Sequence, residues 1–545
     1  MAHRWLFFWN DMTEPTEVER MIARFPRAQA AGFNGVVFPA KLAPAKPREL
    51  KEAAARHGLA LIPVIMGRSM DTHYTEGLPV RDALFVAGDN VLHFQPDNPT
   101  TVRNAGFERV RSDGFAYWTL FSDAGKRAFV EHKVVHSGKI SVYMVPDSGH
   151  CYLSQRVRLQ PFRHYRASLW TRTLGLLPSG QGVGITLTDP KSRQQLTFQN
   201  TRVKPFEDWT EHHVIFNSLD HTEAIISLGA YFPGQSGQLW MDDFTLEEIP
   251  LVNVLRRPGC PIIIRGENGT RYEEGRDFTP IVDSRFHVRD PYHEPPVVLL
   301  TPDTRIQDGE RLRVSYYHPS MIYEFKNSGC LSEQKIYEEW REQVTMLRDL
   351  FHPLGYLMDY DEVRVANWCE ACHSRGMTPG QLLADHLRRS AQIIREVQPG
   401  AEMWLWGDMV DPMANAVDGY FLCNGTMRGS WECLDPDMGI INWYSPLLGA
   451  NCGFFADRGL RQILSDNGGE GDTDGSVIED WMQRTRDIPG IAGVMYTTWR
   501  DNYDAMETWA AKAFADVSPG GPVPADTSQG AVVVPSREHP EAPLL

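Results

Sequence analysis

The first seventy residues alternate between short apolar runs and amphipathic stretches. The runs 4–9, 34–39 and 59–67 are mostly apolar, as expected of strands that are buried on both faces of a sheet. Residues 16–32 and 47–58 separate these runs and carry apolar side chains at helical spacing. Strands and helices that alternate over short connections predict a parallel sheet with crossover helices.

A different pattern occupies residues 71–313. Short runs of alternating apolar and polar positions follow one another between turn residues, and helical periodicity is scarce. They predict an inserted antiparallel β-sandwich over 71–250 and a small β-rich segment over 251–313.

Helical periodicity returns after Ser332, with one apolar face formed by Ile336, Trp340, Val344, Leu347 and Phe351. Further apolar runs follow, and helical stretches separate some of them. Three early and four or five late units predict a (β/α)8 TIM-type barrel made of 1–70 and 314–517, interrupted after its third strand. The run 313–319 fits either a barrel strand or the last strand of the insertion. Residues 518–545, rich in Pro, Gly, Ser and Ala, predict a disordered tail.

Composition narrows the class of protein. The 545 residues include 54 Lys and Arg against 70 Asp and Glu, a net charge of −16, without any basic block. We therefore expect no nucleic-acid partner, because phosphate backbones are bound through clustered cations. We expect no membrane partner, since no apolar run approaches the length of a membrane span. The N-terminal apolar stretch is too short for a signal peptide. A cytoplasmic protein is the prediction, with a signal peptide already removed as the alternative, and a homo-oligomer stays open.

Polar side chains follow many of the predicted barrel strands, and in such barrels the chemistry sits at the carboxyl ends of the strands. The candidates are Asp11, Arg68, His318, Asp359, Asp361, Glu362, Asp408, Asn442, Tyr444 and Arg500, with the tryptophans Trp406, Trp443 and Trp499 among them. Carboxylates cleave glycosidic bonds and indoles stack on sugar rings, so the set predicts a sugar site. For any single acid, a helix cap or a solvated turn is the alternative.

The segment 356–412 resembles the core of the family 20 glycoside hydrolases, the β-N-acetylhexosaminidases. In that family one strand ends in His-x-Gly-Gly-Asp-Glu and a later one in Trp-Asp-Glu. Asp361 and Glu362 match the first Asp-Glu pair, and "WGD" at 406–408 lies where the second signature falls. The resemblance implies that Glu362 is the general acid. It also implies that Asp361 orients the 2-acetamido group, whose oxygen attacks the anomeric carbon.

The chain departs from this family pattern. Leu357 stands where the family has His, and Asp359-Tyr360 replace Gly-Gly. If the substrate has no acetamido group, Asp361 is a conventional base or nucleophile, and Asp408 or Asp359 is its partner. The separation of the two working carboxyl groups then distinguishes inverting from retaining action.

These observations predict an exo-acting glycoside hydrolase that removes a terminal sugar without a catalytic cofactor. The substrate predicted first is a β-N-acetylhexosaminide, cleaved by substrate-assisted retaining catalysis. One alternative is another exo-glycosidase on the same scaffold, sialidase-like or inverting, which uses Asp11, His318 or Asp408. The other is a carbohydrate-binding protein without catalysis.

The segments 104–108, 136–144, 154–173 and 239–249 resemble carbohydrate-binding modules of the jelly-roll type. The resemblance implies a structural calcium ion near Glu108 and Asp243, whose carboxylates are suitable ligands. The alternative is that these acids only close an edge of the sandwich. The module itself would bind sugar, wall the active site or form a dimer contact.

Cys369 and Cys372 have a spacing that is typical of zinc ligands. A zinc site would need two more ligands, and Cys423, Cys433 and Cys452 are the candidates. Because there is no second Cys-x-x-Cys motif, the sequence favours a reduced pair without metal.

Overall fold

The computed structural model describes most of the chain. The described residues are 2–65, 72–97, 99–122, 127–145, 150–177, 183–199, 201–230, 236–288, 292–320, 322, 327–443 and 447–515. The predicted disordered tail, 518–545, lies outside them.

Eight parallel strands form a closed barrel. In spatial order they are β1 (His3–Phe7), β2 (Gly35–Pro39), β3 (Ala60–Ile65), β20 (Gly355–Met358), β22 (Glu402–Trp406), β24 (Met438–Asn442), β25 (Arg461–Asp466) and β26 (Ile491–Tyr496). Strand β26 pairs with β1 and closes the ring. Because all neighbours are parallel, the carboxyl ends of the eight strands lie at the same end of the barrel.

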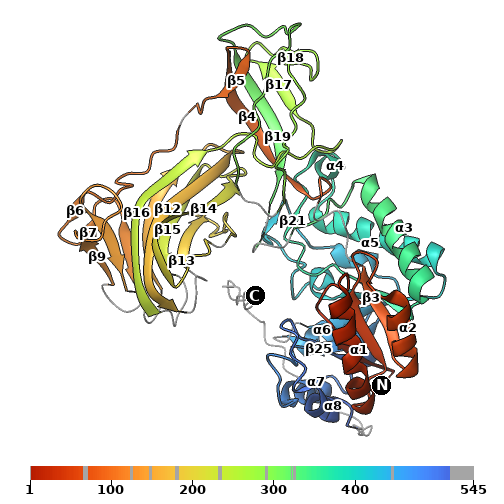
Figure 1. The fold of residues 1–545 in the computed structure, drawn as a ribbon. Helices are drawn as coiled ribbons and strands as arrows, with labels where there is room; N and C mark the ends of the chain where they lie inside the picture. Colours follow the sequence, from red (N-terminus) through yellow and green to blue (C-terminus); the bar gives the residue numbers. More distant parts are fainter. Residues whose placement is uncertain are drawn as a thin grey trace.

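Helices cover part of the outside of the barrel (Figure 1). They are α1 (Pro15–Ala30), α2 (Pro47–Arg56), α3 (Gln334–Phe351), α4 (Glu370–His373), α5 (Pro379–Val397), α6 (Leu448–Ala456), α7 (Ser476–Arg484) and α8 (Met506–Ala513). Helix α5 begins with a capping box between Thr378 and Gln381 and buries an apolar face. In the described ranges, no helix combines the length and the apolar character that crossing a membrane requires.

The structure corrects the predicted (β/α)8 TIM-type barrel. The parallel strands do close, but only 21% of the structure is helical, and several antiparallel sheets accompany the barrel. Between β22 and β24 the chain forms two short 3-10 turns, η2 (Asp408–Val410) and η3 (Ser430–Cys433), where a regular (β/α)8 barrel has a crossover helix. The prediction failed because an apolar strand indicates only that both of its faces are buried. Loops can cover the outer face of a strand as well as helices can.

The insertion after β3 contains a two-sheet sandwich and a small hairpin. One sheet has the order β14-β12-β16-β10-β9 and the other β13-β15-β11-β8. Their bounds are β8 (Thr119–Ser122), β9 (Ala128–Glu131), β10 (Ser141–Met144), β11 (Cys151–Arg158), β12 (His164–Leu177), β13 (Val183–Thr188), β14 (Phe206–Asn217), β15 (Glu223–Ala230) and β16 (Ser236–Glu248). The hairpin is β6 (Val110–Arg111) with β7 (Gly114–Phe115). Alternate side chains of the sandwich strands, such as Leu153 and Ala167, fill a core of their own.

A third antiparallel sheet lies at the top of the view in Figure 1, above the sandwich and the barrel. Its order is β18-β17-β19-β4-β5, with bounds β4 (Gly77–Gly88), β5 (Val91–Phe94), β17 (Ile263–Gly266), β18 (Arg271–Tyr272) and β19 (Arg311–Pro319). The prediction from the sequence includes strands β4 and β5 in the sandwich over 71–250. They belong to this third sheet instead, because β4 pairs with β19 and β5 pairs with β4. The run 313–319 is therefore part of the insertion and does not form a barrel strand.

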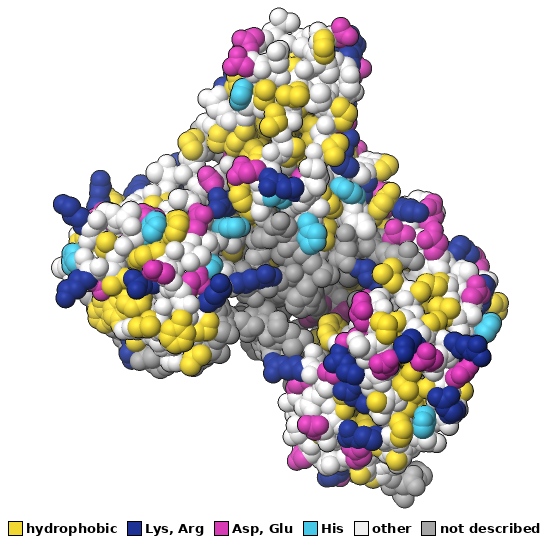
Figure 2. Space-filling view, viewed as in Figure 1, with side chains coloured by type: hydrophobic (Ala, Val, Ile, Leu, Met, Phe, Trp, Pro, Cys, Tyr) yellow, Lys and Arg dark blue, Asp and Glu magenta, His cyan; other side chains and the backbone are white. Residues whose placement is uncertain are grey.

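Charged side chains of both signs are interspersed over the helices of the barrel, as Figure 2 shows. Many of them form exposed ion pairs, such as Arg27 with Glu507 and Arg48 with Glu52. Exposed pairs of this kind contribute little to stability, typically about 0–1 kcal/mol each. The fold therefore depends mainly on the apolar cores.

Indole rings fill the interior of the barrel, and glycines on neighbouring strands leave room for them. The rings of Trp5 and Trp404 meet edge to face at 5.2 Å, and both are fully buried. A Cβ atom placed on Gly439 would lie 2.2 Å from the ring of Trp404. Gly439 in β24 is therefore needed to leave room for the indole ring of Trp404 in β22.

We expect Gly439→Ala to lower the free energy of unfolding by roughly 1–3 kcal/mol, because an overpacked core must shift its neighbours. Denaturant titration would measure the change. Gly449→Ala in α6 is the matched control, since nothing lies within 4 Å of its added Cβ. Equal stabilities of Gly439→Ala and the wild type would contradict this account of the barrel interior.

Candidate active site at the carboxyl ends of two neighbouring strands

Two adjacent barrel strands deliver the predicted acids. Strand β20 pairs with β22, and Met358 lies opposite Leu405 just before both strands end. Asp359, Asp361 and Glu362 follow β20, and Asp408 follows β22 at the start of η2. The register therefore places the two acidic loops side by side.

Asp408 lies at the centre of this group. One of its carboxyl oxygens, Oδ2, accepts hydrogen bonds from the backbone N–H of Glu362 at 3.0 Å and from Nδ2 of Asn415 at 2.8 Å. The other oxygen accepts one from Nε1 of Trp443 at 3.3 Å. Only 2% of Asp408 is exposed. Burial, together with the negative charge of Asp361, raises the pKa of Asp408 to about 7.

Glu362 is engaged with a different partner. Its Oε1 lies 2.7 Å from a guanidinium nitrogen of the buried Arg364, whose guanidinium also stacks over Phe421 at 4.9 Å. Guanidinium groups only donate hydrogen bonds, so the Glu362 oxygen that faces Arg364 carries no proton. The backbone of Glu362 has a φ of 47°, in the left-handed region, and this conformation directs its N–H to Asp408. Such a backbone costs about 1–3 kcal/mol and is concentrated at functional sites.

Tyr420 is a third polar group close to these acids. Its pKa is raised well above the usual value by burial, and by the negative charges of Asp408 and Glu362. The phenol therefore keeps its proton. Sequence reasoning missed Tyr420, Asn415 and Arg364. Only Arg364 could have been suspected from the sequence, because it lies two residues beyond Glu362. Asn415 and Tyr420 belong to a loop whose sequence has no periodicity.

The three predicted tryptophans gather in one aromatic cluster. Trp406, Trp443 and Trp499 all belong to or pack against the barrel-interior cluster, and Trp499 lies 6.3 Å from Trp406 between ring centroids. Trp9, which the candidate set omits, contacts Trp499 edge to face at 4.9 Å. Trp9, Trp443 and Trp499 are only partly buried. They offer the kind of surface on which sugar rings stack.

Several other predicted residues do not join the acids. Asn442 is buried and donates from Nδ2 to Gln462 at 2.8 Å, within the barrel wall. Asp11 is exposed beyond β1, near Lys41. Arg500 is also exposed, and its backbone N–H bonds to Glu470 at 3.1 Å. Arg68 and Tyr444 lie outside the described residues.

His318 is not in the barrel site, which corrects its assignment as a strand-end residue. It lies in β19 and stacks on His164 of the sandwich at 3.7 Å. Its Nε2 accepts a hydrogen bond from Asn217 at 3.0 Å, and its Nδ1 bonds to the carbonyl of Pro319 at 2.9 Å. Burial lowers the pKa of His318 to about 4. The apolar pattern of 313–319 fits a buried strand of either sheet type, so only the pairing reveals its place.

The two residues predicted to bind calcium, Glu108 and Asp243, both contact the same segment of the sandwich, residues 136–140. Glu108 accepts hydrogen bonds from the backbone N–H groups of Lys139 and Ile140, at 2.9 and 3.1 Å. Asp243 bonds to His136 at 2.7 Å and to the hydroxyl of Ser137 at 3.0 Å. These contacts suit a closed sandwich edge, and calcium at Glu108 and Asp243 stays a prediction.

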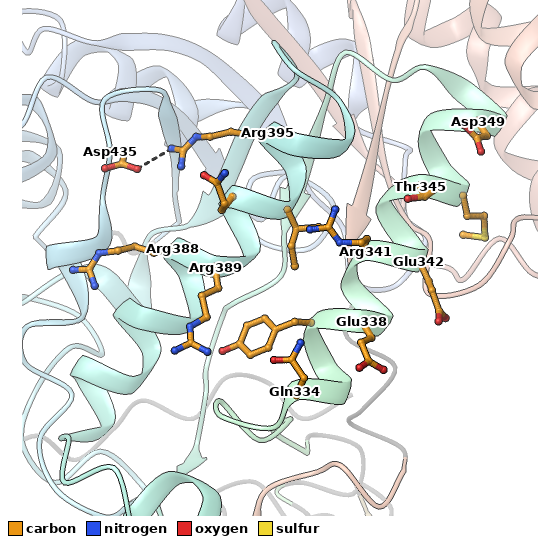
Figure 3. A pocket seen from close by; sticks show the side chains of 14 residues that line it. Gln334, Glu338, Arg341, Glu342, Thr345, Asp349, Arg388, Arg389, Arg395 and Asp435 are labelled. Carbon is orange, nitrogen blue, oxygen red and sulfur yellow. Dashed lines mark hydrogen bonds and ion pairs between the residues drawn. The ribbon is translucent and has the colours of Figure 1, made fainter.

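A large surface groove lies elsewhere, between α3 and α5 (Figure 3). Its volume is about 1160 Å³, and charged side chains such as Arg341, Arg389 and Arg395 line it. Arg395 pairs there with Asp435 at 2.8 Å. None of the predicted site residues lines this groove, so the acids and tryptophans at the strand ends remain the candidate site.

Comparison with known proteins shows no family: no protein-family model and no curated protein matches the chain. Solved structures match parts of it. A chitobiase from Flavobacterium johnsoniae matches 36% of this chain and 30% of its own, at 13% identity and a TM-score of 0.25. An N-acetyl-β-hexosaminidase from Streptomyces plicatus matches 34% of this chain and 38% of its own, at 16% identity and a TM-score of 0.22. A family 4 carbohydrate-binding module matches 27% of this chain and 100% of its own, at 17% identity and a TM-score of 0.22. Similarities this low carry no argument about function.

The raised pKa of Asp408 predicts a pH-dependent stability. Its folded pKa is about 7, whereas an unfolded Asp titrates near about 3.9, so between these values the folded state holds the extra proton. The contribution of Asp408 to the free energy of unfolding should therefore fall by up to roughly 4 kcal/mol as the pH rises from 4 to 7. Asp408→Asn removes this titration.

Denaturant titrations of the wild type and Asp408→Asn at several pH values would measure the effect. The wild type should lose stability relative to the variant between pH 4 and 7, and the difference should level off above pH 7. Asp349→Asn, on the exposed surface of α3, is the control for the loss of a carboxyl group far from the site. A constant difference between wild type and Asp408→Asn would show that Asp408 titrates normally.

Proposed function

We propose that the protein is a glycoside hydrolase whose proton donor is Asp408. The observation that carries the proposal is the environment of Asp408. It is a buried carboxyl group with a pKa raised to about 7, next to Asp361 and close to partly exposed tryptophans. A general acid works best when its pKa lies near the working pH, and glycosidic cleavage needs such an acid beside a second carboxylate.

The roles follow from the contacts of each acid. Asp408 donates its proton to the oxygen of the leaving group, and the hydrogen bonds from Glu362 N–H and Asn415 hold its carboxyl group in place. Asp361, the ionised neighbour, stabilises the positive charge that develops on the sugar. Glu362 is fixed by Arg364 and acts on the sugar as a hydrogen-bond acceptor. The tryptophans stack on the sugar ring.

The proposal differs from the role that the family resemblance implies for Glu362. The ion pair with Arg364 occupies the Glu362 oxygen, whereas Asp408 receives hydrogen bonds from Glu362 N–H, Asn415 and Trp443 that a protonated carboxyl group still accepts. The finer proposal, a terminal β-N-acetylhexosaminide as substrate, rests on Asp361 as the group that orients a 2-acetamido substituent.

A panel of p-nitrophenyl glycosides tests the activity, with β-N-acetylglucosaminide and β-N-acetylgalactosaminide first and sialosides next. Hydrolysis that falls as the pH rises through about 7 is expected, because Asp408 loses its proton there. Hydrolysis restricted to sugars without an acetamido group would reject the acetamido mechanism. Binding without turnover of any glycoside would favour a carbohydrate-binding protein.

Asp408→Asn should reduce hydrolysis of p-nitrophenyl glycosides by about 10²–10⁴-fold, the usual contribution of a general acid. The loss should be smaller for a 2,4-dinitrophenyl glycoside, whose leaving group needs no proton. Glu362→Gln is the matched comparison and should show equal losses for both leaving groups. If the dependence on the leaving group appeared in Glu362→Gln and not in Asp408→Asn, Glu362 would be the acid.

A further inference from the structure

Three cysteines and one glutamate meet in a buried cluster outside the candidate active site. The cluster consists of Glu76, Cys330, Cys369 and Cys372, and all four residues are buried. Their potential ligand atoms lie within 4.8 Å of one another. They come from three segments. Glu76 lies at the start of the insertion, Cys330 lies just before α3, where the chain returns to the barrel, and Cys369 and Cys372 lie at α4. Of these residues, the sequence singled out only Cys369 and Cys372.

The distances within the cluster match a tetrahedral metal site. The sulfur of Cys330 lies 3.4 Å from that of Cys369 and 3.5 Å from that of Cys372. Oε2 of Glu76 lies 3.4 Å from the sulfur of Cys369 and 3.5 Å from that of Cys372. Zinc bonds of about 2.3 Å to sulfur and 2.0 Å to oxygen imply sulfur–sulfur separations of about 3.8 Å and sulfur–oxygen separations of about 3.5 Å.

The surroundings orient the glutamate for this role. Oε1 of Glu76 accepts hydrogen bonds from the backbone N–H groups of Trp368 and Cys369, each at 2.8 Å. Oε2 is thereby directed at the sulfur atoms. Hydrogen bonds that fix a ligating carboxylate in this way are typical of metal sites.

The charges in and around the cluster are also consistent with a bound metal ion. Three thiolates and a carboxylate carry four negative charges in a buried place, where uncompensated charge is costly. A divalent ion neutralises two of them, and the guanidinium of Arg257 lies close enough for its charge to act on Cys330, Cys369 and Glu76. A cleft of about 430 Å³ is lined by Arg257 and Cys260, which lie next to the cluster.

We propose that Cys330, Cys369, Cys372 and Glu76 bind one Zn²⁺ ion that joins the insertion to the barrel. Sulfur ligands in a tetrahedral arrangement select zinc among the common divalent ions. The three thiols release their protons to solvent when the ion binds, and no electron transfer is involved. Cys260 lies near Cys369 but outside the ligand set.

Metal analysis of the full chain, purified without a histidine tag from zinc-supplemented medium, is the first test. About one zinc per chain is expected in the wild type. Replacement of zinc by Co²⁺ should produce the visible absorption of a tetrahedral cobalt–thiolate site. A correctly folded wild type that binds neither zinc nor cobalt would overturn the proposal.

Variants then identify the ligands. Cys372→Ser should lose at least nine-tenths of its zinc, and Glu76→Gln should bind zinc at least tenfold more weakly. Cys151→Ser, at a buried cysteine of the sandwich core, is the matched control and should keep one zinc. Cys260→Ser should also keep it. Loss of zinc in Cys260→Ser with retention in Glu76→Gln would overturn Glu76 as a ligand.

A second measurement does not require any variant to fold. In the native wild type, a thiol reagent applied with a strong chelator should modify three more cysteines than the same reagent without it, because zinc protects its thiolates. Equal modification with and without the chelator would contradict zinc binding at this cluster.

Discussion

The buried carboxyl group of Glu76 is the contact on which the candidate site depends. It accepts hydrogen bonds from the backbone N–H groups of Trp368 and Cys369 and so fixes the far end of the loop that begins at Asp359. A buried carboxyl group needs such partners, and its loss would leave two buried N–H groups unsatisfied. Because Glu76 belongs to the insertion and the loop belongs to the barrel, the acids are held by both.

Apolar packing reinforces this junction from another side. One small cluster joins Leu78 of the third sheet, Phe198 and Leu219 of the sandwich region, and Val365 and Leu422 of the barrel loops. β21 (Val365–Ala366) and β23 (Leu422–Cys423) pair there. Gln194 of the insertion also donates to the carbonyl of Phe421 at 2.5 Å. The insertion therefore packs against the barrel loops that follow β20 and β22, and it lies in the chain between the paired strands β3 and β20.

The residues that surround each acid in the fold determine which task that acid can perform. Asp361, Glu362 and Asp408 are similar carboxyl groups in the sequence, and nothing in their order distinguishes a proton donor from an ionised partner. In the fold, Asp408 is buried and bonded to the neutral donors Asn415, Trp443 and the backbone N–H of Glu362, and its pKa rises, whereas the Glu362 side chain lies against Arg364. The environment separates the carboxyl groups into different tasks, as is common in hydrolytic sites.

The sequence by itself determined most strands of the barrel, though not β25, and it marked the acids and tryptophans near the strand ends. Strands buried on both faces must be apolar throughout, and polar residues must then mark the strand ends, so this information is local. Only the tertiary structure decided that β19 with His318 belongs to the insertion, that the helical cover is incomplete, and that Arg364, Asn415 and Tyr420 surround Asp408. It alone brought Glu76 and Cys330 to Cys369, across 293 and 39 residues of chain. Contacts at such separations are set by how the sheets pack together, and no periodicity along the chain records them.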